Sequence, residues 1–333
     1  MKSQRSFLFT LIFWSFLIAI SIKGCSLNGE ATLKPFKVGL NSWPGYQVAL
    51  YGQETGLFRQ HGLEVEFVRF TNQQDNIRAT MRGAQDASFV PLAEVLQVDP
   101  NQEAPVYIMV ADISAGSDGI VAGPNITSIK DLKGKKVSVK LGTVPHLVLL
   151  EALKANQLQP DDIEIVDVIN ERGAEMLKQG KISASVLWEP LLSDTAKSIG
   201  GKVIHTTADV DSIVIDGLAT RSSMMTSKQD ELVRFIETWF DIMKAIEKNP
   251  QAVFTSVAKQ LGTTVEIFAE DYKGLKKGDL EMNRRMFEGG RLPEASQQTR
   301  QLLLADVRHG RIIREDVKIN GELIAKATKN WQQ

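Results

Sequence analysis

The chain has 333 residues, with 39 basic and 40 acidic side chains and a formal net charge of -1. This balance excludes the strongly basic surface of a protein that binds nucleic acid or an anionic membrane face. One cysteine and four scattered histidines leave no disulfide, no CxxC motif and no histidine pair with metal-ligand spacing. We therefore expect a globular protein that binds no metal or other cofactor.

Residues 1–24 have the three-part layout of a bacterial export signal. Lys2 and Arg5 precede an apolar run over residues 7–22, and polar sequence from Asn28 onward supplies no stop-transfer pattern. The run has about 16 residues, at the short limit for a membrane-spanning helix. We therefore expect the mature chain to face the outside of the inner membrane, with an uncleaved anchor as the alternative.

Cys25 follows this apolar run in the sequence Ile22-Lys23-Gly24-Cys25. The pattern resembles the lipobox of bacterial lipoproteins, in which the cysteine is diacylated and becomes the mature first residue. Acyl chains contribute about 0.8 kcal/mol per buried methylene, so two or three are needed for lasting attachment. We expect lipidation of Cys25 and a polar tether over residues 25–35, unless the cysteine is incidental.

Strand and helix patterns alternate in the first part of the mature chain. They are a strand at 38–40, a Pro-containing loop at 42–46, a helix at 47–55, a strand at 63–70, a helix at 73–81 and the segment Gly83–Phe89. Such alternation favours parallel sheets with right-handed crossovers.

The same order recurs about 100 residues later. It comprises a strand at 136–139, a loop at 141–145, a helix at 146–155, a strand at 163–168, a helix at 173–178 and the segment Gly180–Val186. Three pairs of residues coincide at one offset of 97: Gly83 and Gly180, Ala87 and Ala184, Ser88 and Ser185. The repeat predicts two similar lobes, although any one coincidence is also expected between unrelated α/β units.

A further strand at 213–220 is followed by a helical tail. The expected helices cover 228–248, 250–261, 264–273, 296–308 and 321–331. Because this tail has no new strand set, it must pack on an existing sheet. We therefore assign residues 36–121 and 218–333 to lobe one and residues 122–217 to lobe two. The crossovers are expected near 118–123 and 216–221, with Asp118 as a turn residue.

Several motifs together resemble one protein family. They are Trp43-Pro-Gly-Tyr46, Glu54-Thr-Gly-Leu-Phe58, Gly62-Leu-Glu-Val-Glu66, Gly83-Ala-Gln-Asp-Ala87, the segment Ile129–Val137, Thr143-Val-Pro-His146 and Trp188-Glu-Pro190. The chain is similar to periplasmic substrate-binding proteins of ABC importers, in the branch for nitrate, taurine, aliphatic sulfonates and thiamine-pyrimidine precursors. Related pyrimidine-synthesising enzymes carry a cysteine-rich motif, which this chain lacks.

The resemblance implies a two-lobed α/β fold of the type II periplasmic-binding-protein class. Each lobe would be a mixed, mostly parallel sheet flanked by helices, with the ligand cleft between the lobes. The implied partners are a small organic solute and an ABC permease with its ATPase, and the chain would be a monomer.

Two loops with aromatic residues are candidates for the solute site, since ligands of open parallel sheets bind beyond the carboxyl ends of the strands. Trp43 and Tyr46 follow the first strand on a rigid turn, and aromatic faces bind flat rings, apolar chains or cations. A core position for Trp43 and a rim position for Tyr46 are alternatives. We expect Trp188 to occupy the corresponding loop of the second repeat. Glu189 can accept hydrogen bonds from a solute amine or amidine, or favour the start of the next helix.

Thr143 and His146 lie where free N–H groups at a helix start favour anions, although Thr143 could simply cap the helix. Asp216 ends its strand and can contact the solute or stabilise the hinge. No arginine or lysine falls on these loops, which disfavours a bare inorganic anion and favours a neutral, zwitterionic or cationic solute with a flat or apolar part. The predicted ligand-binding residues are Trp43, Tyr46, Thr143, His146, Trp188, Glu189 and Asp216.

Three functions are compatible with this sequence. The leading hypothesis is a lipid-anchored receptor that delivers a taurine-like, sulfonate-like or pyrimidine-precursor-like solute to an ABC importer. The second is an exported lyase or hydrolase that uses His146 with Glu189 or Asp216 as acid and base. The third is a sensor that binds the solute and docks on a membrane signalling protein. A permease gene or a kinase gene beside this one would separate the first from the third.

Overall fold

The computed structural model describes residues 34–100 and 103–331. The predicted export signal, Cys25 and most of the predicted tether lie outside these residues. Within the described ranges, no helix combines the length and the apolar character that a membrane span requires.

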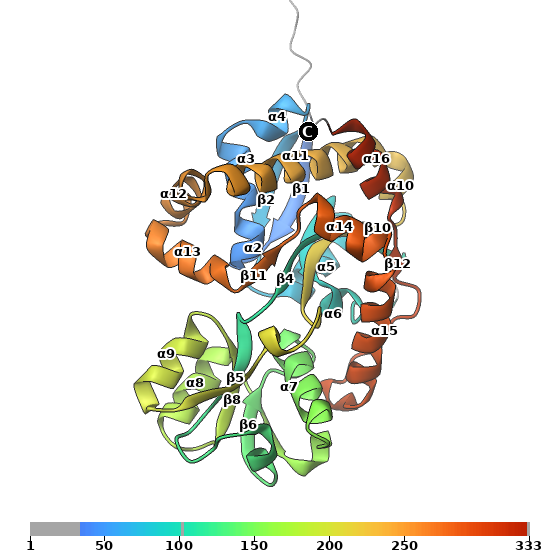
Figure 1. The fold of residues 1–333 in the computed structure, drawn as a ribbon. Helices are drawn as coiled ribbons and strands as arrows, with labels where there is room; N and C mark the ends of the chain where they lie inside the picture. The colour runs from blue at the N-terminus through green and yellow to red at the C-terminus, as the bar shows by residue number, and fades with distance from the viewer. Residues whose placement is uncertain (1–33, 101–102, 332–333) are drawn as a thin grey trace, which may run out of the picture. The chain divides into compact units, whose positions relative to one another are not determined.

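The larger of two sheets has seven strands in the order β11-β4-β10-β3-β1-β2, with β12 beside β4. Its strands are β1 (Pro35–Leu40), β2 (Glu64–Arg69), β3 (Ala87–Pro91), β4 (Pro105–Ser114), β10 (Ile215–Arg221), β11 (Leu275–Lys277) and β12 (Lys318–Ile319). Strand β1 is parallel to β2 and β3, whereas β10 is antiparallel to β3 and β4. We call this sheet and the elements packed on it lobe one (Figure 1).

The smaller sheet has five strands in the order β7-β6-β8-β5-β9 and forms lobe two. Its strands are β5 (Asp118–Ala122), β6 (Lys136–Val139), β7 (Glu164–Asp167), β8 (Ala184–Trp188) and β9 (Lys202–Thr206). Strand β6 is parallel to its neighbours, and β5 is antiparallel to both of its own. The expected mixed α/β fold is confirmed, but antiparallel pairs are more frequent than predicted because β5 and β10 run against the repeated strands.

The two sheets contain the predicted repeat. Val38 is opposite Ala87 in the first sheet, and Val137 is opposite Ala184 in the second. Gly83 and Gly180, just before the equivalent strands β3 and β8, have φ of 79° and 68°. These angles lie in the left-handed region that glycine adopts readily. The offset of 97 residues therefore reflects equivalent turns and strands.

Helices cover both sheets. Lobe two carries α7 (Val144–Ala155), α8 (Asn170–Lys178) and α9 (Leu191–Ile199). The other helices are α2 (Pro44–Gln47), α3 (Ala49–Glu54), α4 (Leu57–Gln60), α5 (Gln73–Met81), α6 (Leu92–Val95), α10 (Met224–Ser227), α11 (Gln229–Lys248), α12 (Pro250–Leu261), α13 (Val265–Lys273), α14 (Leu280–Phe287), α15 (Arg291–Leu304) and α16 (Glu322–Asn330). Helix α11 buries Leu232, Phe235, Ile236 and Trp239, the spacing of one helix face.

The chain passes between the sheets through residues 115–117 and 207–214, not at the segments predicted as crossovers. Those segments lie within β5 and β10 because their apolar residues complete strand ladders, so Asp118 begins a strand and is not a turn residue. The division into lobes at residues 121 and 217 remains a prediction.

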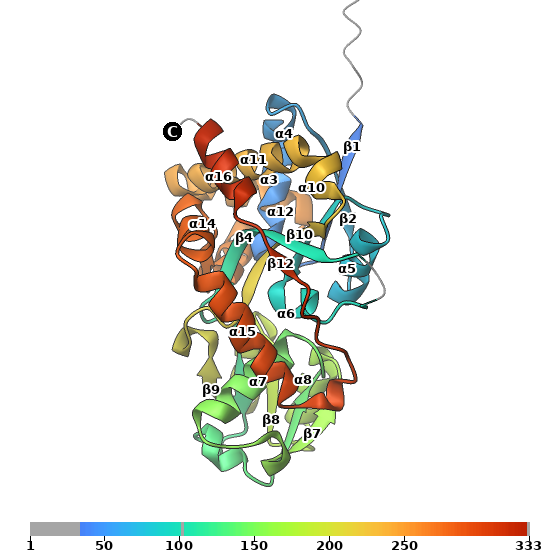
Figure 2. The ribbon, with the colours of Figure 1, turned by 90° about the vertical axis from the view of Figure 1, so that its right-hand side faces the viewer.

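The tail differs from the prediction in three ways. It contributes the short strands β11 and β12 to the larger sheet, and it contains helix α14, which was not expected. Helix α15 begins at Arg291, earlier than predicted, and contacts both α14 and α7 (Figure 2). Its residues Leu302 and Leu303 belong to the hydrophobic core of lobe two. The tail therefore packs on both sheets.

Candidate functional site

The turn after β1 directs two polar groups toward the region where the chain passes between the sheets. Trp43 is half-buried, and its Nε1 donates a hydrogen bond to Asp112 Oδ1 at 3.1 Å. The Tyr46 hydroxyl donates a short hydrogen bond to Asp216 Oδ1. Tyr46 is fully buried, and its ring stacks on Phe89 with 5.2 Å between centroids. The rim position considered for Tyr46 is therefore wrong, because the ring belongs to the core of lobe one.

Gly45 explains how Asp112 reaches this turn. A Cβ atom on residue 45 would lie 1.9 Å from Asp112 Oδ2, far inside van der Waals contact. Only glycine allows the carboxyl group to lie against the backbone there. The Trp-Pro-Gly-Tyr sequence is thus matched to a buried carboxyl group on β4.

Three aspartates meet at this point, and we call Asp112, Asp118 and Asp216 the hinge acid cluster. Asp112 and Asp216 are directly opposite on β4 and β10, and Asp118 begins β5 of the other sheet. Each is at most 2% exposed, and one carboxyl oxygen of each has no hydrogen-bond partner among the described residues. The cluster therefore combines carboxyl groups from both sheets, and each group has one hydrogen-bonded oxygen and one oxygen without a partner among the described residues.

Burial raises the pKa of all three carboxyl groups. The pKa of Asp112 rises to about 7, with the charge of Asp118 adding to the effect of burial. The pKa of Asp118 also rises to about 7, with Glu189 as the neighbouring charge. Burial and then Asp112 raise the pKa of Asp216 well above its usual range. Removal from water disfavours the charged form of an acid, so these groups hold protons near neutral pH.

Sequence reasoning found Asp216 but missed Asp112 and misread Asp118. The available signal was a lone acid inside an otherwise apolar strand, since Asp112 interrupts the fully buried run Pro105–Ser114. A carboxyl group in such a strand needs a partner or a function.

The second aromatic loop ends β8. Trp188 lies opposite Asp118 and is 38% exposed, so it presents a ring at the surface of lobe two. The carboxylate of Glu189 accepts hydrogen bonds from the backbone N–H and the hydroxyl of Ser193 in α9. This contact supports the alternative in which Glu189 stabilises the helix start. Trp188 corresponds to Pro91 at the end of β3, so the expectation that Trp43 and Trp188 occupy equivalent loops is wrong.

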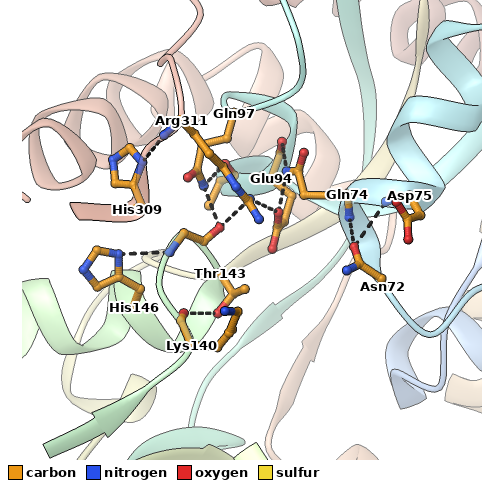
Figure 3. Close-up of polar contacts among 12 residues, drawn as sticks. Asn72, Gln74, Asp75, Glu94, Gln97, Lys140, Thr143, His146, His309 and Arg311 are labelled. Atoms are coloured by element: carbon orange, nitrogen blue, oxygen red, sulfur yellow. Dashed lines mark hydrogen bonds and ion pairs between the residues drawn. The ribbon is translucent and has the colours of Figure 1, made fainter. Parts of the chain in front are cut away.

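The start of α7 is held by a buried histidine (Figure 3). His146 Nδ1 accepts a hydrogen bond from the Gly142 N–H at 3.2 Å, and Nε2 lies 3.0 Å from Asp306 Oδ2. Burial lowers the pKa of His146, opposed by Asp306. The ring is fully buried with both nitrogens engaged, so it orders the loop and does not face a solute. The Thr143 hydroxyl donates to the Lys140 carbonyl and makes no side-chain cap of α7.

Arg311 links the same loop to lobe one, as Figure 3 shows. Its guanidinium donates to Glu94 Oε2 at 3.0 Å and to the Gly142 carbonyl at 2.7 Å. Gln97 also donates to the Gly142 carbonyl, and Gln74 donates to the Glu94 carboxylate. We call Glu94, Arg311 and their two glutamine partners the Arg311 network. Burial raises the pKa of Glu94, while Arg311 opposes the shift.

The described residues contain no group of three or more histidine, cysteine, aspartate or glutamate side chains placed to hold a metal ion. The hinge acid cluster therefore offers carboxyl oxygens for hydrogen bonding, but not a metal coordination shell. The interlobe region therefore has two polar parts among the described residues. Around Arg311 (Figure 3) the Glu94 carboxylate is paired with a cation, although Oε1 of Gln74 and of Gln97 has no partner. Around the aspartates one oxygen of each carboxyl group has no partner.

A family model described as NMT1/THI5 like matches residues 43–253. A Brucella abortus protein described as a binding protein is 28% identical over 171 residues, which are 51% of this chain and 52% of that protein. The chain thus spans about half the length of this relative. The taurine-binding periplasmic protein of Escherichia coli is 23% identical over 58% of this chain and 60% of that protein.

A longer match is an ABC transporter periplasmic binding protein of Brachyspira hyodysenteriae, 25% identical over 81% of this chain and 86% of that protein. Among solved structures, the periplasmic aliphatic sulphonate binding protein SsuA from Escherichia coli has a TM-score of 0.64 at 17% identity, covering 80% of this chain and 94% of that one. The desulfurization enzyme DSZB has a TM-score of 0.62 at 14% identity, covering 90% and 100%. These structures share the fold of this chain. Because the family model covers more than half of the sequence, the chain belongs to the NMT1/THI5-like family.

Proposed function

We propose that the chain is the solute-binding component of an ABC importer, working on the periplasmic side of the cell envelope. Family membership, the two-sheet fold and relatives named as periplasmic binding proteins support this proposal. Its partners would be a small organic solute, a permease and an ATPase, and the chain itself would be a monomer.

The observation that carries the proposal is the convergence of two lobes on one region. Trp43, Asp112 and Asp216 come from lobe one, while Asp118 and Trp188 come from lobe two. A solute bound there contacts both lobes and stabilises their closed arrangement. A ligand shifts such an equilibrium only by the difference in its affinity for the two states.

The names of relatives suggest the solute class. They include proteins described as binding taurine and aliphatic sulfonates. For this chain we propose a taurine-like, sulfonate-like or pyrimidine-precursor-like solute with a flat or apolar part that contacts Trp43 or Trp188. Of the predicted site residues, Tyr46, Thr143 and His146 would act by shaping the surrounding loops.

An enzymatic role has weaker support, although a desulfurization enzyme shares the fold. His146, the proposed acid or base, is fully buried with both ring nitrogens bound. A general acid or base must reach the proton that it transfers. Incubation with a bound solute followed by product analysis would show unchanged solute.

Lipid attachment at Cys25 is a separate proposal that rests on the lipobox-like sequence. Cys25→Ser should leave the precursor uncleaved and abolish incorporation of labelled palmitate. Equal labelling of the variant and the unaltered protein would disprove the anchor without affecting the transport proposal.

The transport proposal is tested by closure. Native mass spectrometry of protein purified without refolding should show a co-purified small molecule. Small-angle scattering with that molecule at saturation should give a smaller radius of gyration than the stripped protein. A protein that neither retains a solute nor changes its scattering with taurine, ethanesulfonate or an aminopyrimidine would refute solute capture by closure.

A further inference from the structure

We propose that the solute carries a protonated nitrogen, an ammonium or amidinium group, which binds among the carboxyl groups of the hinge acid cluster. This inference rests on the proposed solute-binding function and specifies the charge of the solute. It separates this chain from relatives whose names indicate sulfonates.

The first observation is the set of unused acceptors. Oδ2 of Asp112, of Asp118 and of Asp216 each lacks a hydrogen-bond partner although the residues are at least 98% buried. Buried polar atoms in folded proteins are nearly always hydrogen-bonded, and leaving them unpaired is costly. These three atoms come from three neighbouring strand ends of one cluster, and a group with several N–H donors would satisfy them together.

The second observation comes from a different element. The hydroxyl of Tyr272 on α13 is also buried without a hydrogen-bond partner, and the residue is only 7% exposed. Burial raises the pKa of Tyr272, and the charge of Asp112 is the next cause, which places the hydroxyl near the cluster. Tyr272 therefore adds a neutral acceptor on the lobe-one side of the same region.

The groups around the cluster do not neutralise it. The nearest basic residue in the strand register is Lys277, opposite Asp112 on β11, but its Nζ lies 3.5 Å from Asp279 and 3.6 Å from Glu247. The other titratable neighbours are tyrosines or acids: Tyr46, Tyr107, Tyr272 and Glu189. A sulfonate placed here would be repelled by any ionised carboxyl group, whereas a bound cation would stabilise the ionised form of these groups.

The acidic character continues across the two lobes. Burial and then Glu189 raise the pKa of Asp271 on α13, with Glu270 and Asp194 as further neighbouring acids. Asp194 belongs to α9 of lobe two, so acids of both lobes lie within electrostatic range of one another. Trp188, exposed beside Asp118, offers an aromatic face of the kind that attracts cations. A flat or apolar cation could therefore contact the hinge aspartates and the indole ring of Trp188 at the same time.

The first test compares probes of one shape and three charges. Benzamidinium and benzylammonium are cationic, benzamide is neutral, and benzenesulfonate is anionic. At pH 7.5 the two cations should raise the melting temperature and bind measurably by calorimetry, at least 10-fold more tightly than benzamide. A melting temperature that benzenesulfonate or ethanesulfonate, which carry no protonated nitrogen, raises and neither cation changes would overturn the cation site.

Variants locate the site. Asp112→Asn and Asp216→Asn each keep an oxygen that can accept from Trp43 or Tyr46, and each should weaken binding of benzamidinium 10-fold or more. Asp86→Asn is the matched control, because Asp86 is a buried aspartate of lobe one that pairs with Lys228. It should bind benzamidinium as the unaltered chain does. Equal affinity of all three variants would place the cation elsewhere and overturn the assignment.

Proton release is the readout that a purely structural cluster would not give. The cluster holds protons near neutral pH, so a bound cation should favour ionisation and release them. The apparent binding enthalpy at pH 7 should therefore differ between phosphate and Tris buffers in the unaltered chain, and less in Asp112→Asn. Scattering that shows closure with ethanesulfonate, which carries no protonated nitrogen, but not with benzamidinium would refute the cation site and leave the transport proposal standing.

Discussion

The hinge acid cluster and the Arg311 network are both buried and both connect the lobes, yet they differ in how their charge is compensated. Glu94 is 3% exposed and receives donors from Arg311 and Gln74. The three hinge aspartates are at least as buried, and their hydrogen-bond partners are neutral: an indole for Asp112, a tyrosine for Asp216 and Ser114 for Asp118. Burying a charge without a partner costs stability. We therefore interpret the Arg311 network as a structural contact and the hinge acid cluster as a candidate binding site.

The largest expected change in the free energy of unfolding follows the loss of the ion pair between Arg311 and Glu94. Arg311→Met leaves the buried Glu94 carboxylate facing the Gly142 carbonyl without its cation. We expect a loss of about 3 kcal/mol in the free energy of unfolding, at the low end for a broken buried pair because Arg311 is partly exposed. Urea unfolding measures it.

A second variant keeps this prediction specific. Adding Glu94→Gln to Arg311→Met should recover part of the loss, since no charge is then left unpaired. Arg59→Met is the control, because its ion pair with Glu64 is exposed, so its loss should lower the free energy of unfolding far less than the loss of Arg311 does. Equal losses for Arg59→Met and Arg311→Met would contradict the contrast between the two clusters.

In the hinge acid cluster, a substitution that removes an ionisable group should increase the free energy of unfolding at neutral and higher pH. A folded pKa of about 7 for Asp112 lies above the unfolded value of about 3.9, so the folded chain binds more protons between these values. The free energy of unfolding should therefore fall as pH rises from 5 to 8. Asp112→Asn should flatten this slope and stabilise the chain by roughly 2 kcal/mol at pH 8, taking about 1.4 kcal/mol per pKa unit and allowing for the buried amide. An unaltered chain whose stability is constant over this range would refute the assigned protonation.

The aromatic residues beside the cluster should affect binding more than folding. Trp188→Ala removes an exposed ring and should weaken solute binding about 10-fold, or about 1.4 kcal/mol, with unchanged circular dichroism. Trp43→Ala should weaken binding similarly but also release Asp112 from its hydrogen bond, so it should shift the pH dependence of stability. Unchanged affinity in both variants would place the solute elsewhere.

The smallest effect is expected at Glu189. Its carboxylate is directed to Ser193, so Glu189→Gln should cost less than about 1 kcal/mol of stability, as for other helix-start contacts. A glutamine oxygen can still accept the Ser193 N–H, so closure measured by scattering should be retained. A Glu189→Gln variant that binds the solute but no longer closes would show that Glu189 contacts the solute directly.

Local signals account for the elements that the sequence predicted well. Helices α5 and α12 have the expected bounds because their ends are set nearby: Asn72 caps the first, and Asn249 with Pro250 starts the second. The site depended on contacts between distant residues. Asp112 meets Asp216 across two strands, and Arg311 meets Glu94 from 217 positions away, so no periodicity in one sequence could pair them. Trp43, Trp188 and Asp216 could be proposed from the sequence because they adjoin strand ends, and their contact with a solute remains a prediction.

Helix α15 makes the joint between the lobes stiffer than two linking segments alone would be. Its first turns place Leu292 and Ala295 in a core of lobe one, and its last turn places Leu302 and Leu303 in the core of lobe two. Fourteen helical residues span about 21 Å, and a helix resists bending over that length. Any rotation of one lobe against the other must displace or bend α15. The energetic cost of doing so rises with the rotation angle and limits the amplitude of the motion. The rotation of the two lobes against each other should accordingly have a small amplitude.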